Sequence, residues 1–187
     1  MARAKFVKKA RKDIKGTDIK KGDSYYWWKF KFGQKQVSKT QPKASQLTQS
    51  DFLGTIYDIQ DRISELTTND DLSSEVESIV SDLESLRDEC EEKRSNMPEQ
   101  LQDTGSGEIL QNRYDAIDEM IDELQSVETD VDEDDIEQEI RDSNEMDGDD
   151  ETVDEYDSRI QDLIDEEIEN KKEEILSEIQ NISYNGE

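Results

Sequence analysis

The stretch Leu72–Cys90, "LSSEVESIVSDLESLRDEC", has the clearest apolar pattern in the chain. Its apolar side chains recur at alternating spacings of four and three residues: Leu72, Val76, Ile79, Leu83, Leu86 and Cys90. This heptad seam of about three repeats predicts a helix that packs one stripe against another helix. We expect the helix to end near Met97-Pro98, because proline disfavours helical backbone in the residue before it.

A second seam with the same rhythm follows after the polar segment "PEQLQDTGSG", residues 98–107, which we expect to be a loop. Its apolar members are Leu110, Tyr114, Ile117, Ile121 and Leu124. Two matched seams joined by a short polar loop predict an antiparallel helical hairpin.

Another helix is expected before the hairpin and packed alongside it. Thr48 and Asp51 have the spacing of a capping box, so we place its start there. Thr67–Asp70, a group of poor helix formers, should end it. Its predicted inner face is Phe52, Ile56, Ile59, Ile63 and Leu66.

The segment Ser24–Thr40, "SYYWWKFKFGQKQVSKT", predicts a two-stranded ribbon. Alternation gives one face with Tyr26, Trp28, Phe30 and Phe32, and another with Tyr25, Trp27, Lys29 and Lys31. Gly33-Gln34 suits a tight turn with glycine first, and "KQVSKT" would return as the second strand. A lone ribbon is marginally stable, so its aromatic face should pack on something, and residues 1–23 could supply a third strand or a short helix.

The C-terminal part is strongly acidic. Between Glu128 and Asp157 there are 17 acidic residues and one arginine, which predicts a linker or a frayed helix. Residues 153–187 combine an apolar stripe with charge and predict a long helix. This helix could dock on the hairpin, pair with a second copy or bind a partner.

Together these patterns predict a mainly α protein, an elongated antiparallel helical hairpin or coiled-coil bundle with a small N-terminal β-ribbon and an acidic C-terminal helix. We divide the chain into a basic aromatic ribbon (1–47), a helical hairpin or bundle (48–127), an acidic linker (128–152) and an acidic helix (153–187).

The charge of the 187-residue chain is unevenly distributed. Residues 1–50 carry a net charge of +11 and residues 51–187 a net charge of −39, which gives −28 for the whole chain. Only 30% of the residues are hydrophobic, which is too few for a thick globular core. Such charge asymmetry indicates polyelectrolyte partners.

Several classes of function lack the residues that they require. The chain has no histidine, one cysteine, no glycine-rich phosphate loop and no nucleophile motif, so we expect neither an enzyme nor a cofactor. Ser143–Asp154, "SNEMDGDDETVD", resembles a calcium loop, but Ser leads it and Asp replaces the final Glu. We therefore predict no metal site.

The sequence also bears on where the protein acts. The start "MARAKFVKKARKD" lacks the apolar core of a secretory signal, and no run approaches the ~20 apolar residues of a membrane span. We expect a soluble, cytoplasmic protein with no membrane partner.

Three segments, "SYYWWKFKFG", "SKTQPKASQLTQSDF" and "MPEQLQDTGSGEILQNR", resemble segments of small uncharacterised bacteriophage proteins. The similarity covers about residues 1–125 and fades in the acidic tail. The resemblance implies a phage setting, in the cytoplasm of the host cell, and no particular mechanism.

The leading hypothesis is an inhibitor whose acidic helices imitate nucleic acid. Carboxylates fixed on rigid helices would occupy the basic, nucleic-acid-binding surface of a host nuclease, defence protein or polymerase. The residues that we expect to carry this role are Asp115, Asp118, Glu119, Asp122, Glu123, Asp132, Glu133, Asp134 and Asp135.

The basic ribbon offers a second interaction surface, formed by Tyr25, Trp27, Lys29, Lys31, Lys35 and Lys39. It could dock on the protein's own acidic helices, bind single-stranded nucleic acid under regulation by the acidic tail, or bind a protein. Docking is favoured, because an intramolecular partner is always present at high effective concentration. A last alternative is an assembly or scaffold module that forms homodimers through the heptad seams.

Overall fold

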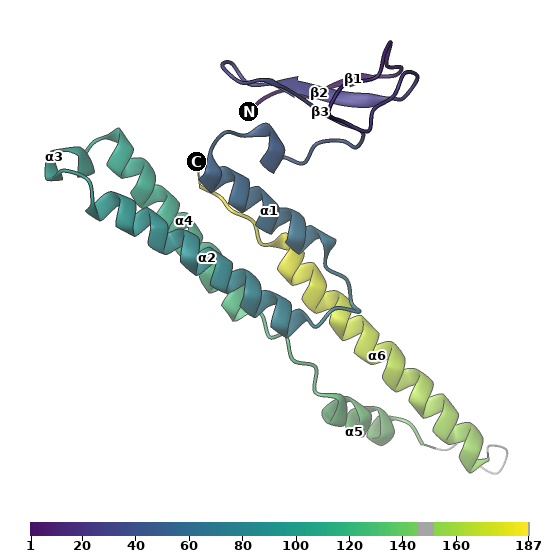
Figure 1. Ribbon diagram of the computed structural model, residues 1–187. Coiled ribbons are helices and arrows are strands. Elements are labelled where there is room, and N and C mark those ends of the chain that lie inside the picture. Colours follow the sequence, from purple (N-terminus) through teal and green to yellow (C-terminus); the bar gives the residue numbers. More distant parts are fainter. Residues whose placement is uncertain (146–151, 187) are drawn as a thin grey trace. The chain divides into compact units, whose positions relative to one another are not determined.

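The computed structural model describes residues 1–145 and 152–186, and the fold is mainly helical with a small antiparallel sheet at the N-terminus (Figure 1). This confirms the predicted fold class at that level. The chain divides into two compact units, Met1–Arg62 and Ile63–Glu187. The boundary lies within α1 (Asp51–Glu65), whereas the sequence placed a boundary at residue 48.

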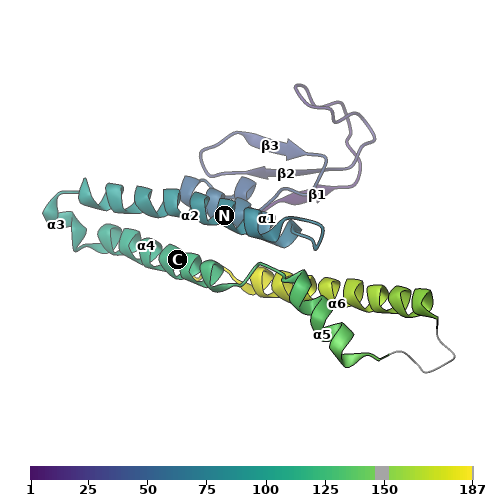
Figure 2. The same cartoon turned by 90° about the horizontal axis from the view of Figure 1, so that it is seen from below.

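Three strands in the order β1-β2-β3 form the sheet of the N-terminal unit (Figure 2). β1 (Lys5–Val7) and β3 (Lys35–Ser38) both pair antiparallel with the central β2 (Tyr25–Lys29). The first residues of the chain therefore supply a third strand and not a short helix. This strand gives the ribbon the support that a two-stranded hairpin lacks.

The turn between β2 and β3 is wider than predicted. β2 ends at Lys29, and the backbone N–H of Gly33 donates to the carbonyl of Phe30 at 3.2 Å. Gly33 does not have a positive φ, so the expected tight turn with glycine first is wrong. As a result Phe30 and Phe32 lie outside the strand, and Phe32 is 91% exposed.

A long basic loop joins β1 to β2. Its backbone is held by Ala10, whose N–H donates to the Asp23 carbonyl (2.7 Å) and whose carbonyl accepts from Gly22 (2.9 Å). Gly16 and Gly22 have φ angles of 79° and 103°, which glycine adopts without strain. Ala10 and Ile19 of this loop are buried, so the basic segment keeps apolar side chains away from solvent.

The N-cap of α1 (Asp51–Glu65) lies two residues later than predicted. After η1 (Ser45–Leu47), the Ser50 hydroxyl accepts from the backbone N–H of Leu53 at 3.3 Å. The Thr48 hydroxyl instead accepts from the N–H of Ser50 at 3.2 Å, within the turn that leads into α1. The prediction of Thr48 as the N-cap was therefore wrong, but the prediction of the apolar face of this helix was right. All five predicted inner-face residues are buried: Phe52, Ile56, Ile59, Ile63 and Leu66.

α2 (Leu72–Ser95) and α4 (Gly105–Ser126) pack side by side in both views and form the predicted hairpin (Figures 1 and 2). Asp71 caps α2 by accepting from the N–H of Ser74 at 3.1 Å. All six predicted seam residues of α2 are buried, together with Val80. In α4 the buried side chains are Leu110, Ile117, Met120, Ile121 and Leu124, and Tyr114 is half-buried.

The segment predicted as a loop between the two seams is more ordered than expected. It contains a short helix, α3 (Glu99–Gln102), and α4 already begins at Gly105. Gly107 is buried where α3 meets α4, and a Cβ atom there would overlap the backbone carbonyl of Gln102. Only glycine fits this closely packed joint.

The predicted acidic linker contains a helix, α5 (Glu133–Ser143). Asp132 caps it by accepting from the N–H of Asp135 at 3.1 Å. Its Ile136 forms a small core with Ile160 and Ile164 of α6, which extends over Val153–Asn181. These three isoleucines, with partly buried apolar side chains packed around them, hold the acidic helix α5 against α6.

The C-terminal half of α6 packs against other parts of the second unit. Ile179 is fully buried, and Gln180 Nε2 donates to the carbonyl of Leu66 at 3.2 Å. The Thr68 hydroxyl donates to Glu169 Oε1 at 2.7 Å. These contacts hold the C-terminal half of α6 to the segment between α1 and α2, whereas the sequence left open docking on the hairpin, pairing with a second copy or binding a partner.

We predict that Leu83→Ala lowers the free energy of unfolding of the helical unit by about 2–5 kcal/mol, because it leaves a cavity in the α2–α4 seam. Leu83 is fully buried. Urea unfolding followed by circular dichroism at the helix band measures the loss. The neighbouring exposed Glu84→Ala serves as control and should stay within about 0.5 kcal/mol of the wild type. Equal losses of unfolding free energy in the two variants would contradict the claim that the buried seam stabilises this unit.

Candidate partner-binding surfaces

The register of the sheet gathers basic and aromatic side chains on one face. Trp27 lies opposite Lys5 of β1 and Val37 of β3, and Lys29 lies opposite Lys35. Side chains directly opposite each other in antiparallel strands share a face. We call Lys5, Tyr25, Trp27, Lys29 and Lys35 the cationic-aromatic face.

Two lysines flank the indole of Trp27. Lys35 Nζ lies 4.5 Å from a ring centroid of Trp27 and Lys5 Nζ lies 5.2 Å from one. Lys35 Nζ is also 5.8 Å from the ring of Tyr25. Each such contact contributes about 0.5–1 kcal/mol at an exposed site, so the lysines can leave the ring for a stronger anionic partner at small cost.

The other two predicted lysines lie apart from this face. Lys31 is in the turn, with its Nζ 5.4 Å from the ring of Phe32. Lys39 follows β3 and forms an ion pair with Asp23 at 3.3 Å. Asp23 also accepts from the backbone N–H of Lys20 at 3.0 Å. These two hydrogen bonds, that of Lys20 first, hold the pKa of Asp23 below its ordinary value.

The β1–β2 loop is a basic surface that the sequence did not single out. Its exposed cations are Lys8, Lys9, Arg11, Lys12, Lys15, Lys20 and Lys21. The Asp13 carboxylate accepts from the N–H of Lys21 at 2.7 Å and fixes one side of the loop. Spaced aspartates and two glycines among the lysines were the signal of a structured loop.

The acidic residues predicted on α4 divide into two groups. Asp115, Glu119, Asp122 and Glu123 are exposed and follow one another at helical spacings, and we call them the α4 acidic ridge. Asp118 is half-buried, and its Oδ1 accepts from Arg87 Nη1 of α2 at 2.7 Å. Asp118 therefore joins the two helices of the hairpin.

The Arg87 contact is tied to the seam. Its guanidinium lies 5.8 Å from the ring of Tyr114, and the hydrogen bond to Asp118 raises the pKa of Arg87 above its ordinary value. Cys90, one turn further along α2, is buried, and burial raises the pKa of its thiol. Cys90 thus fits a small core side chain better than a reactive thiol.

The remaining predicted acids begin α5. Glu133, Asp134 and Asp135 are exposed in its first turn, where the helix dipole favours negative charge, and Asp132 is the cap. Their local structural role is sufficient to account for their presence. They lie on a different helix from the α4 acidic ridge.

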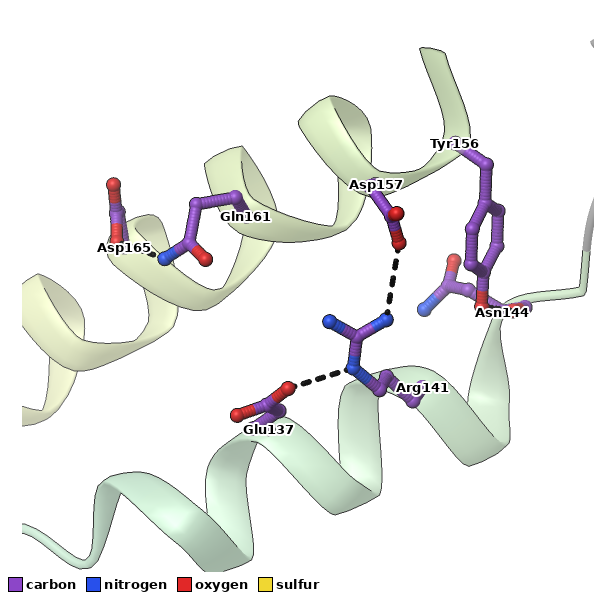
Figure 3. Close-up of polar contacts among 7 residues, drawn as sticks. All are labelled: Glu137, Arg141, Asn144, Tyr156, Asp157, Gln161 and Asp165. Carbon is purple, nitrogen blue, oxygen red and sulfur yellow. Dashed lines mark hydrogen bonds and ion pairs between the residues drawn. The ribbon is translucent and has the colours of Figure 1, made fainter. Parts of the chain in front are cut away.

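An arginine joins α5 to α6 (Figure 3). Arg141 Nε donates to Glu137 at 2.7 Å, and its Nη1 lies 3.5 Å from Asp157 of α6. The hydroxyl of Tyr156 donates to the carbonyl of Asn144 at 2.9 Å. These contacts fix α5 beside α6, so that the carboxylates of both helices have defined positions.

No group of three or more described acidic or cysteine side chains is arranged to hold a metal ion. The calcium-loop resemblance depends on Asp147, Gly148, Asp149 and Glu151, which lie outside the described residues. Within the described ranges, no helix combines the length and the hydropathy needed to cross a membrane.

We predict that Asp23→Asn destabilises the N-terminal unit at pH 7 and that the difference disappears in acid. A depressed folded pKa gives stability that is present above the unfolded value of about 3.9 and is lost as the pH falls through the folded pKa. Both tryptophans lie in β2, so urea unfolding followed by their fluorescence reports on this unit.

The matched control is Asp18→Asn, an exposed aspartate of the same loop, which should change stability little at any pH. A difference between Asp23→Asn and the wild type that persists unchanged below pH 3 would contradict the role of the Asp23 carboxylate.

No family model, curated protein or solved structure matches this chain.

Proposed function

We propose that the chain is a non-enzymatic inhibitor, encoded by a bacteriophage, whose acidic helices imitate nucleic acid and occlude a basic surface of a host protein. The host protein would be a nuclease, a defence protein or a polymerase in the host cytoplasm. The observation that carries the proposal is the α4 acidic ridge, which stands exposed on a helix whose opposite side is buried in the α2–α4 seam.

The charge density of the hairpin supports this proposal. α2 carries eight acidic and three basic side chains, and α4 carries six and one. Over the length of the hairpin this is one net negative charge per about 3.6 Å. One strand of DNA has a charge every ~3.4 Å and the duplex one every ~1.7 Å, so the hairpin approaches a single strand most closely.

Rigidity is the second support. Carboxylates on a flexible chain would have to be ordered on binding, at a cost in conformational entropy. Here the buried seam and the Arg87–Asp118 contact hold the helices in place before any partner arrives. A cationic cleft could then release its counterions to solvent with little ordering cost, which is the force that drives nucleic-acid binding.

The assembly alternative receives less support. The seam residues that could have joined two copies are already buried within one chain. A homodimer through these seams would require the hairpin to open.

We predict that binding to the host partner requires the α4 acidic ridge. Asp115→Asn, Glu119→Gln, Asp122→Asn and Glu123→Gln together should weaken it by about tenfold or more, since several ion contacts are removed at once. The control removes four exposed acids of α6: Asp162→Asn, Glu173→Gln, Glu174→Gln and Glu178→Gln. This control variant changes the net charge by the same amount and should lower the affinity for the host partner by about threefold or less.

The assay is recovery of host proteins on immobilised protein at two salt concentrations, followed by competition with oligonucleotides. The recovered partner should be a nucleic-acid-binding protein. Its affinity for the immobilised chain should fall steeply as the salt concentration rises, and its own nucleic acid should displace it. A partner that nucleic acid does not displace, or equal losses in the two quadruple variants, would refute mimicry by this ridge.

A second candidate function is favoured by the cationic-aromatic face. A half-buried ring flanked by lysines, as at Trp27, resembles the arrangement that single-strand-binding surfaces use, with stacking on the base and cations at the phosphates. In this case the acidic tail would compete with nucleic acid and regulate its binding.

We predict for this candidate that oligo(dT) at low salt quenches the fluorescence of Trp27. Trp27→Phe should abolish the quenching, while the remaining buried Trp28 reports that the unit is still folded. Unchanged fluorescence of the wild type, at oligonucleotide concentrations that saturate single-strand-binding proteins, would reject the candidate.

A further inference from the structure

A groove of about 470 Å³ runs along the junction of α5 and α6, apart from the α4 acidic ridge. The residues that line it recur at spacings of three and four on both helices, so each helix turns one face toward it. From α5 and its end these are Ile136, Glu139, Ile140, Ser143 and Asn144, and from α6 Leu163, Glu166, Glu167, Asn170 and Lys171.

The groove has an apolar floor and an acidic rim. Ile136, Ile140 and Leu163 supply the floor, and Ile140 and Leu163 remain half-exposed although both border the small core of α5 and α6. Two helices alone cannot enclose their apolar stripes, and in helical bundles a third helix covers this position.

The rim carboxylates have no basic partner among the residues that the structure describes. Within residues 1–145 and 152–186, Glu139, Glu166 and Glu167 form no ion pair, and Lys171 is the only cation that lines the groove. The other side of the same junction differs, since there Arg141 forms ion pairs with both Glu137 and Asp157. The groove therefore has a net negative charge that an occupant must match.

We infer that this groove binds a cationic amphipathic helix of a partner protein. Its apolar side chains would cover the floor, and lysines or arginines on its flanks would reach the three glutamates. α5 has 11 residues, about 16 Å, so roughly three turns of a partner helix fit along it. This deepens the proposed function and rests on it in one respect, that the partner is basic.

The charge selects this occupant over a second copy of the chain. Each copy would bring another groove lined by the same three glutamates, together with an acidic α5 and α6, and like charges at an interface oppose association. A helix of neutral surface would cover the floor but leave the glutamates without partners.

The probe is a fluorescent, amidated leucine–lysine peptide of about four helical turns, with leucine every three or four residues so that one face is apolar. A permuted peptide of the same composition, with no continuous apolar face, is its control. Fluorescence anisotropy measures both affinities for the full chain, and amide chemical shifts locate the bound peptide. We expect the patterned peptide to bind about tenfold or more tightly than the permuted one, with shifts in α5 and α6.

Two variants separate the groove from diffuse charge. The groove variant combines Glu139→Gln, Glu166→Gln and Glu167→Gln, and its affinity for the patterned peptide should fall by about tenfold. The control variant combines Glu77→Gln, Glu84→Gln and Glu92→Gln at exposed positions of α2, and its affinity should fall by about threefold or less. Leu163→Asn removes apolar floor without changing charge and should also weaken binding. Helix content by circular dichroism checks that each variant is folded.

Equal losses in the two triples, or equal binding of the two peptides, would overturn the inference. So would shifts that show the groove occupied by a second copy or by the chain's own residues 1–47. The α4 acidic ridge is intact in all these variants, so a failure here leaves the mimicry proposal standing. Conversely, groove binding that persists while nucleic acid fails to displace the host partner would remove mimicry and keep the groove.

Discussion

The burial of one narrow apolar seam between α2 and α4 is the interaction on which the helical unit depends. The unit is made of strongly acidic helices, and like charges three or four residues apart each cost a few tenths of a kcal/mol. Each fully buried leucine or isoleucine contributes about 1.5–3 kcal/mol. Ile79, Leu83, Ile117 and Leu124 are fully buried. The seam therefore outweighs the repulsion, and the surface is left to hold carboxylates at fixed positions.

The two units solve the problem of low hydrophobicity in different ways. The second unit relies on apolar stripes of helices, whereas the N-terminal unit combines the apolar face of α1 with a sheet that uses aromatic side chains and backbone hydrogen bonds. Phe6 and Tyr26 pack with their ring centroids 4.9 Å apart on one face of the sheet, and Trp28 is buried. On the other face Lys5 and Lys35 flank Trp27. With a basic sheet and acidic helices, the chain has one surface that favours anionic partners and another that favours cationic partners.

Sequence periodicity predicted the long helices well, because a stripe of apolar residues is a local property that burial in a partner helix leaves unchanged. Details that depend on single hydrogen bonds or on distant contacts were missed. Ser50 caps α1 although Thr48 fitted the capping pattern, and Gly33 lies in a wider turn. The acidic segment was predicted as a linker or a frayed helix, and the choice could not be made because α5 is held by Ile136 packing on α6, a distant contact that its own sequence does not reveal. For the candidate surfaces, the sequence identified exposed acids but not that Asp118 is bound to Arg87.

Gly107 has a consequence for how such a chain can diverge. A partner that senses charge density tolerates exchange of Asp for Glu or movement of a carboxylate by a turn, so the acidic positions are free to drift among descendants. The joint between α3 and α4 has no such freedom, because any side chain at Gly107 would overlap the backbone of Gln102. Distant kin of this chain should therefore be recognisable by an invariant glycine between two apolar heptads, long after their charged residues have lost all resemblance.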